Sequence, residues 1–270
     1  MPDGFTKSIP TEPTRKFPWR VFWLLLVASL AGAAAVIPFS LEVLRPMMRA
    51  APPLPFSLPL LVVLGVVENL TLLAVAIGLG LLLARKIGLG APLLEGWLYH
   101  QDARVSARKS LMSGVLVGIA VGIFVLIILL VAAPHLTGLP FVSASRAALW
   151  KRLLAGFYGG IDEEILTRLF LLTLLAWLGV RIFQRQKARL SSATFWVANI
   201  IVAILFGLGH LPAASMVMHI TPTVVALALV LNGVAAISFG YLYWKRGLEA
   251  AMIAHFCADF VIYVVGVKFL

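Results

Sequence analysis

Long apolar runs are the feature that most constrains the fold of this chain. An α-helix rises about 1.5 Å per residue, so about 20 apolar residues cross the hydrocarbon of a bilayer. Backbone polar groups in hydrocarbon must be paired within their own segment, which favours helices. Runs of this kind are predicted at residues 20–42, 56–84, 110–133, 153–180, 192–211, 221–244 and 248–268. The sequence therefore predicts an all-α polytopic transmembrane helical bundle with about seven spans, or eight if one run is divided.

The composition supports a membrane protein and argues against a nucleic-acid partner. Hydrophobic residues make up 61% of the chain and charged residues only 12%, against about 25% charged residues in soluble domains. The net charge of +11 comes from basic residues that lie between the apolar runs, where such residues set topology and contact anionic lipid. We expect the lipid bilayer as a partner, and no nucleic acid.

The distribution of basic residues predicts the orientation of the chain. Residues 1–18 are polar and proline-rich and predict a short disordered arm, followed by a membrane domain over 19–270. With the N-terminus inside, the inner segments carry 15 Lys and Arg residues and the outer segments carry 6. The positive-inside rule then predicts a cytoplasmic N-terminus and an external C-terminus.

The stretch GGIDEEILTRLFLL, residues 159–172, places four charged residues inside the fourth run. Each ionised residue at mid-helix costs about 2.5–3.5 kcal/mol, so such residues usually serve a function. Glu164 and Arg168 are spaced i, i+4 and share a helix face, which predicts an ion pair. Glu163 lies about 100° away and is predicted to be the free carboxylate. The alternative is that Asp162 and these three residues form an inert buried network.

Two further stretches add imidazoles and a carboxylate. AILFGLGHLPAA places His210 at the end of the fifth run, and GLEAAMIAHFCADFV places His255 and Asp259 on one face at i, i+4. Cys257, the single cysteine, points elsewhere, which argues against a Cys–His nucleophile. Glutamate, histidine and aspartate are the groups that activate water and stabilise an oxyanion.

Because each of these groups is costly in hydrocarbon, we expect them to converge on one water-filled cavity. The side chains of Glu163 and His210 should lie within one bridging water, roughly 5–6 Å apart. The site would lose its basis if His210 and His255 were more than about 12 Å apart. For these two to meet, the fifth helix must extend past Leu211, or the boundaries of the spans must shift.

The three motifs together resemble a known family. EEILTR is similar to the motif EExxxR, FGLGH to FxxxH and HFCAD to HxxxN/D, in the order found in the CPBP family of CAAX proteases and bacteriocin-processing enzymes, also called Abi. The motif-bearing core covers about 145–268. The resemblance implies an integral multi-pass protein of a prokaryotic cytoplasmic membrane. It also implies an intramembrane endopeptidase that hydrolyses a peptide bond of a membrane-associated protein or peptide.

The resemblance also implies a role for each residue. Glu163, the first glutamate of the pair with Glu164, and His210 would activate a water, while His255 and Asp259 would stabilise the oxyanion. Relatives commonly have asparagine at the last position, and a carboxylate donates a hydrogen bond only when protonated. We therefore expect Asp259 to orient His255 or to hold a proton.

Several alternatives stay open from the sequence. A metal-free mechanism is favoured, although Glu163, His210 and His255 would also form a three-ligand zinc set. The same charges would suit a transporter or an ion or proton relay, or a non-catalytic immunity or scaffold protein. Glu68, in the second run, fits none of the motifs, and its role is left open.

Overall fold

The computed structural model describes residues 16–50, 56–103, 105–132, 147–184, 190–216 and 218–269. Every regular element in these ranges is a helix. The α-helices are α1 (Trp19–Ala50), α2 (Leu58–Ile87), α3 (Pro92–Tyr99), α4 (Ala107–Ala132), α6 (Leu149–Tyr158), α7 (Thr173–Phe183), α8 (Ser192–Gly209), α9 (Leu211–Ser215), α10 (Pro222–Arg246) and α11 (Leu248–Asp259). The π-helices are η2 (Gly159–Glu163), η3 (Ile165–Leu172) and η4 (Phe260–Val265), and η5 (Gly266–Lys268) is a 3₁₀ turn.

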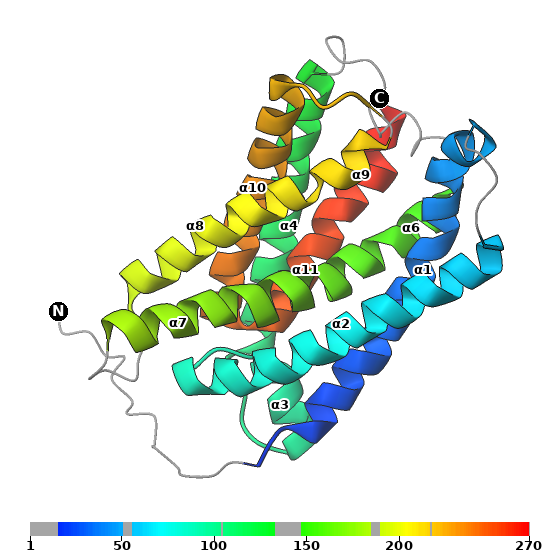
Figure 1. The fold of residues 1–270 in the computed structure, drawn as a ribbon. Coiled ribbons are helices and arrows are strands. Elements are labelled where there is room, and N and C mark those ends of the chain that lie inside the picture. Colours follow the sequence, from blue (N-terminus) through cyan, green and yellow to red (C-terminus); the bar gives the residue numbers. More distant parts are fainter. Residues whose placement is uncertain are drawn as a thin grey trace.

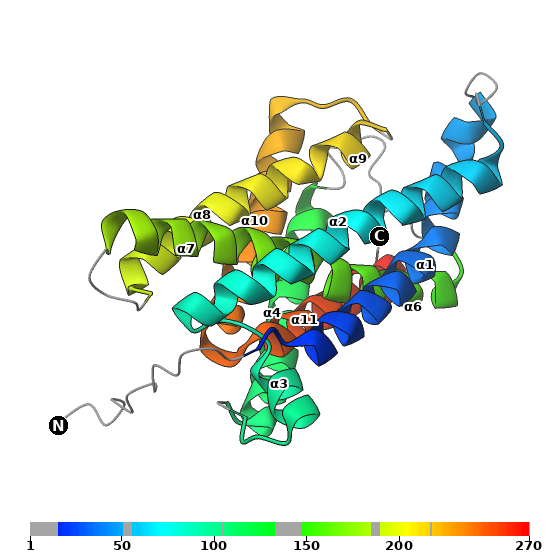
Figure 2. The same cartoon turned by 60° about the horizontal axis from the view of Figure 1, so that its bottom comes forward.

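The described part of the chain contains seven segments long and apolar enough to cross a membrane, which confirms the predicted fold class. They are Trp19–Leu44, Leu58–Ile87, Ala107–Ala132, Leu149–Phe183, Ser192–Ser215, Pro222–Arg246 and Leu248–Lys268. The boundaries differ from the predicted runs by a few residues. The short helix α3 was not predicted, and Figure 2 shows it beside the bundle of long helices. Most of the predicted arm, residues 1–15, lies outside the described residues.

Helix α11 packs against elements from both halves of the chain. One face contacts α4, and another contacts η2 and α6. Helix α1 packs against α2 and α6, α2 packs against η3, and α8 packs against α10, as Figure 1 shows. The motif-bearing helices are therefore held in place by spans that carry none of the motifs.

The contact between α4 and α11 is built from small residues. The glycines of α4 that face α11 are Gly114, Gly118 and Gly122, and the nearby alanines of α11 are Ala250, Ala254 and Ala258. A Cβ atom at Gly118 would lie 2.3 Å from the carbonyl oxygen of Ala254. Helices in lipid associate through such close packing, because lipid tails are as apolar as the side chains. Helix α4 therefore fixes the helix that carries His255.

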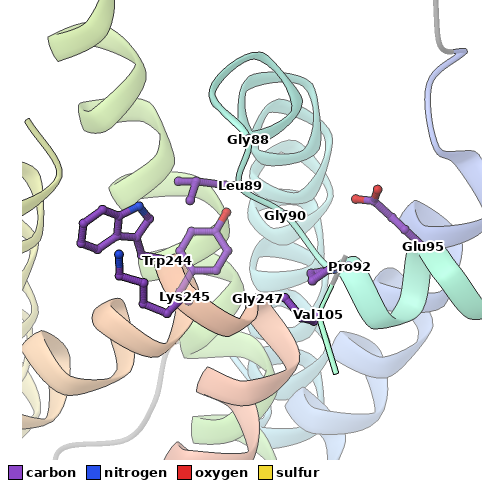
Figure 3. A pocket seen from close by; sticks show the side chains of 10 residues that line it. Gly88, Leu89, Gly90, Pro92, Glu95, Val105, Trp244, Lys245 and Gly247 are labelled. Carbon is purple, nitrogen blue, oxygen red and sulfur yellow. The ribbon is translucent and has the colours of Figure 1, made fainter. Parts of the chain in front are cut away.

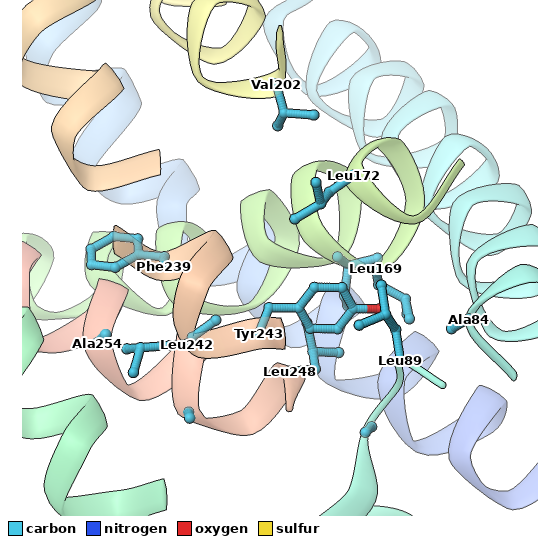
Figure 4. Close-up of a cluster of buried hydrophobic side chains, with 14 of the residues drawn as sticks. Ala84, Leu89, Leu169, Leu172, Val202, Phe239, Leu242, Tyr243, Leu248 and Ala254 are labelled. Atoms are coloured by element: carbon cyan, nitrogen blue, oxygen red, sulfur yellow. The ribbon is translucent and has the colours of Figure 1, made fainter. Parts of the chain in front are cut away.

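An apolar cluster anchors η3 to α10 and α11 (Figure 4). Leu169 and Leu172 of η3 and Phe239 of α10 are fully buried in it. The hydroxyl of Tyr243 is buried too, and it is hydrogen-bonded to Thr173 Oγ1 at 2.8 Å. Because this buried hydroxyl is paired, the cluster contains a polar contact without a desolvation penalty.

Candidate active site

The segment that carries the acidic residues is wound as π-helix rather than as regular α-helix. η2 and η3 meet at Glu164, so the wide turns coincide with the first motif. Two hydroxyls bond to carbonyl oxygens of this segment: Thr167 Oγ1 donates to Glu163, and Thr173 Oγ1 donates to Arg168. π-helical turns are rare and occur frequently at functional sites. The sequence did not predict this winding.

Glu164 and Arg168 form the predicted ion pair. Arg168 Nη1 lies 2.9 Å from Glu164 Oε1, and the two side chains are 1% and 0% exposed. The guanidinium also donates to Thr167 Oγ1 and lies 5.2 Å from the ring centroid of Phe206 and 5.5 Å from that of Phe239. These contacts offset part of the cost of removing two charges from water.

Glu164 has a second contact that the sequence did not reveal. Its Oε1 accepts a hydrogen bond from Nδ1 of His255 at 2.7 Å, across 91 positions of the sequence. The sequence had suggested that Asp259 orients His255, but in the structure Nδ1 of His255 is hydrogen-bonded to Glu164. With Nδ1 bonded in this way, the other ring nitrogen, Nε2, faces the remaining acidic groups.

Glu163 and Asp259 lie on either side of His255 Nε2. Glu163 Oε2 is 3.7 Å from this nitrogen and Asp259 Oδ2 is 3.8 Å from it. These separations exceed a direct hydrogen bond, but they are short enough for attraction between opposite charges when His255 is protonated. The motifs of η2 and α11 thus meet at one ring nitrogen.

Gly159 lets the backbone of η2 pack closely against this nitrogen and against Asp259, and sequence reasoning missed it. A Cβ atom at Gly159 would lie 2.4 Å from Asp259 Oδ2 and 3.0 Å from His255 Nε2. Any larger residue at this position would collide with these two polar atoms. The pair of glycines that precedes the acidic stretch was the available signal in the sequence.

His210 follows α8 directly and reaches the site region through Phe206. Its Nδ1 lies 2.8 Å from the Phe206 carbonyl oxygen, and its ring packs edge-on against the Phe206 ring at 4.6 Å. The Phe206 ring is 6.3 Å from the His255 ring. The ring centroids of His210 and His255 therefore cannot be further apart than the sum of these two distances. This sum is below the limit of about 12 Å that the sequence analysis set for a shared site. The distance between Glu163 and His210 stays a prediction.

The extent of the fifth span agrees with the condition stated from the sequence for His210 and His255 to meet. The fifth span continues through α9 to Ser215, past Leu211. In Figure 1, α8 and α9 follow one oblique line across the bundle.

Three other residues lie away from His255 Nε2. Glu68 is exposed on α2. Cys257 lies toward α4, where its Cβ would be 2.7 Å from a Cβ built at Gly118. Asp162 is fully buried and lies against Gly32 of α1. The four charged residues of the stretch 159–172 therefore do not lie in one cluster.

The zinc alternative finds no prepared ligand set. Among the residues that the structure describes, no three His, Cys, Asp or Glu side chains are arranged to hold a metal ion. Whether catalysis uses a metal stays a prediction, which metal analysis of the purified protein tests.

A small pocket of about 60 Å³ lies elsewhere, between the α2–α3 and α10–α11 connections (Figure 3). The residues that line it are Gly88, Leu89, Gly90, Pro92, Glu95, Val105, Tyr243, Trp244, Lys245 and Gly247. None of these is a candidate site residue. A water-filled cavity beside Glu163 stays a prediction.

Carboxylates and imidazoles gathered within membrane-spanning helices define a polar intramembrane site of the kind that hydrolytic enzymes use. Residues 145–261 match the model of the family described as type II CAAX prenyl endopeptidase Rce1-like. This match confirms the resemblance to CAAX proteases of the CPBP family, and it covers all three motifs. No curated protein matches the chain, and no solved structure matches it.

Proposed function

We propose that this protein is an intramembrane endopeptidase that hydrolyses a peptide bond of a membrane-associated protein or peptide. The matched family is described as a prenyl endopeptidase, which supports the reaction class. The observation that carries the proposal is the set of contacts around His255. Glu164 bonds to Nδ1, while Glu163 and Asp259 flank Nε2.

Glu163 is the general base in this proposal. Its side chain is 24% exposed, whereas that of Glu164 is 0% exposed. Glu163 is therefore the less buried of the two carboxylates, and the proposal places the attacking water beside it. The Glu163 carboxylate takes a proton from this water while the water oxygen attacks the scissile carbonyl carbon. His210 contributes a second hydrogen bond to the water.

His255 stabilises the charge that develops on the carbonyl oxygen. In its protonated form, His255 donates from Nε2 to the oxyanion and from Nδ1 to Glu164. Arg168 holds Glu164, which in turn holds the ring, so the donor is positioned before the reaction begins. Glu163 then passes its proton to the leaving amine, and no acyl-enzyme forms.

Asp259 acts next to Nε2 rather than at Nδ1. Its Oδ2 lies on the Nε2 side of the ring, beside Gly159. As a carboxylate, it accepts a hydrogen bond from the water, because both N–H groups of the imidazolium are already engaged. It does not replace an asparagine as a donor unless it is protonated.

Cleavage in isolated membranes tests the proposal. New N-termini of membrane proteins and peptides are compared between cells with the wild-type protein and cells with Glu163→Gln. Glu68→Gln is the matched control, because Glu68 also lies in a span but is exposed on α2. We expect the cleavage products to disappear with Glu163→Gln and to persist with Glu68→Gln. Equal products in all three strains would favour the relay or scaffold alternative.

The proposal includes a cytoplasmic N-terminus. Seven spans place the two ends of the chain on opposite sides of the membrane, and the basic residues favour the N-terminal side as cytoplasmic. Reporter fusions after Lys109 and Arg189 should report the cytoplasm, and a fusion after Leu270 should report the outside. A cytoplasmic reporter at Leu270 would contradict this orientation.

A further inference from the structure

Asp162 is a buried carboxyl group that the catalytic steps above do not use. It is 0% exposed. Neither of its carboxyl oxygens has a hydrogen-bond partner among the residues that the structure describes. An unpaired carboxyl in hydrocarbon is costly, so its position calls for a specific reason.

Helix α1 provides a fitted surface for this carboxyl. Ser29 is its polar neighbour there, and the fully buried Ser29 hydroxyl interacts with the carboxyl without reaching the geometry of a full hydrogen bond. Gly32, three residues further on the same face of α1, faces the carboxyl directly. A Cβ atom at Gly32 would lie 2.4 Å from Asp162 Oδ2 and 3.2 Å from its Cγ. Helix α1 thus presents to Asp162 the hydroxyl of Ser29 and, at Gly32, a position without a side chain.

The location of this contact connects it with Glu163. Asp162 and Glu163 are adjacent on η2, so a rotation of η2 about its axis moves both side chains together. A change between π-helical and α-helical winding would produce such a rotation, because the two differ in residues per turn. Holding Asp162 against α1 therefore also fixes the direction in which Glu163 points.

We propose that Asp162 is a positioning residue, whose carboxyl, seated against Ser29 and Gly32 of α1, fixes the rotation of η2 and hence the placement of Glu163. Its catalytic consequence rests on the proposed function. Helix α1 lies before residue 145, outside the family match. The inference thus gives the N-terminal part of the chain a specific role at the site.

Gly32→Ala tests the contact on purified protein with a cleaved peptide. The added methyl group would displace the Asp162 carboxyl, and a displacement of about 1 Å near a reacting group costs on the order of 100-fold in rate. We expect kcat to fall by about 10-fold to 100-fold, with KM changed much less. Gly233→Ala is the matched control, because a Cβ atom there meets nothing within 4 Å.

The double variant separates positioning from simple destabilisation. In Gly32→Ala/Asp162→Ala, the methyl group at 32 occupies space that the carboxyl has left. We expect its kcat to exceed that of Gly32→Ala alone, a departure from additivity that residues in contact show. Wild-type kcat in Gly32→Ala, or effects that simply multiply in the double variant, would overturn the proposal.

Substitutions at Asp162 decide the matter if Gly32→Ala does not fold. Asp162→Asn keeps the shape and can bond to the Ser29 hydroxyl, whereas Asp162→Leu keeps only the approximate size. We expect Asp162→Asn to retain most of the wild-type kcat and Asp162→Leu to lose it. Equal kcat values for the two would overturn the proposal.

A labelling experiment tests the placement of residue 163 without any cleavage. Glu163→Cys is combined with Cys257→Ser, which removes the single native cysteine, and the rate of reaction with a water-soluble thiol reagent is measured. We expect Gly32→Ala to change this rate and the further change Asp162→Ala to restore it. An unchanged rate would overturn the positioning role. Failure of the proposed function would appear separately, as wild-type protein without Glu163-dependent cleavage.

Discussion

Two faces of helix α11 pack against glycines of other helices, and the two contacts have different roles. On one face, Ala254 meets Gly118 of α4, where a Cβ atom would lie 2.3 Å from a backbone oxygen. On the other face, His255 and Asp259 meet Gly159 of η2, where a Cβ atom would lie against the side chains of both residues. The first glycine brings two backbones together, and the second brings a backbone close to the polar side chains of the candidate site.

This difference separates stability from chemistry. The α4 face is apolar and close-packed, so it contributes to the stability of the bundle. The η2 face places the charges of one membrane helix, from Glu163 to Arg168, beside Asp259 of α11, an arrangement that costs free energy unless each charge is paired. Substitutions on the two faces should therefore have different effects on melting and on turnover.

Arg168→Ala should have the largest effect, on the polar face. It leaves Glu164 buried with no guanidinium, and breaking a buried ion pair costs about 3–5 kcal/mol in soluble proteins. We expect a clearly lower melting temperature in detergent, together with lost cleavage. Adding Glu164→Gln to Arg168→Ala should recover part of the stability, because the unpaired charge is gone. A wild-type melting temperature for Arg168→Ala would show that the pair does not stabilise the fold.

Gly159→Ala should come next, with its effect on turnover rather than on melting. The methyl group would contact Asp259 Oδ2 and His255 Nε2, and small displacements of reacting groups reduce rates on the order of 100-fold. We expect kcat to fall accordingly, while the melting temperature changes little. The control is Gly65→Ala on α2, where a Cβ atom meets nothing within 4 Å. Normal turnover in Gly159→Ala would mean that the close approach at Gly159 is not needed.

Gly118→Ala should show the opposite pattern on the α4 face. Overpacking an interface costs about 1–3 kcal/mol, and the neighbour here is backbone, which cannot turn aside. We expect a lower melting temperature, with cleavage per folded molecule close to wild type. If turnover falls as much as in Gly159→Ala, the two faces of α11 are not independent.

The contrast between these faces also shows what the sequence could reveal. Apolar length predicted the seven spans, and the i, i+4 spacing predicted the pair of Glu164 with Arg168. Both are local properties of the chain. The contact of Glu164 with His255 spans 91 positions, and the π-helical winding depends on packing partners. The seat of Asp162 on α1 requires Gly32, a residue that looks like any other small residue of an apolar run.

Cys257→Ala should have the smallest effect. Cys257 lies two residues from His255, but it is on the side of α11 that faces Gly118 of α4. The mechanism proposed above uses a water and not a thiol, so removal of the sulfur should leave kcat unchanged. The partly buried side chain loses little packing, so we expect the melting temperature to fall slightly, within the ~1 kcal/mol typical of mild substitutions. Thiol reagents should likewise leave cleavage by the wild-type protein unaffected. A loss of cleavage in Cys257→Ala without a loss of folded protein would assign the chemistry to a thiol, and would place the reactive face of α11 on the α4 side.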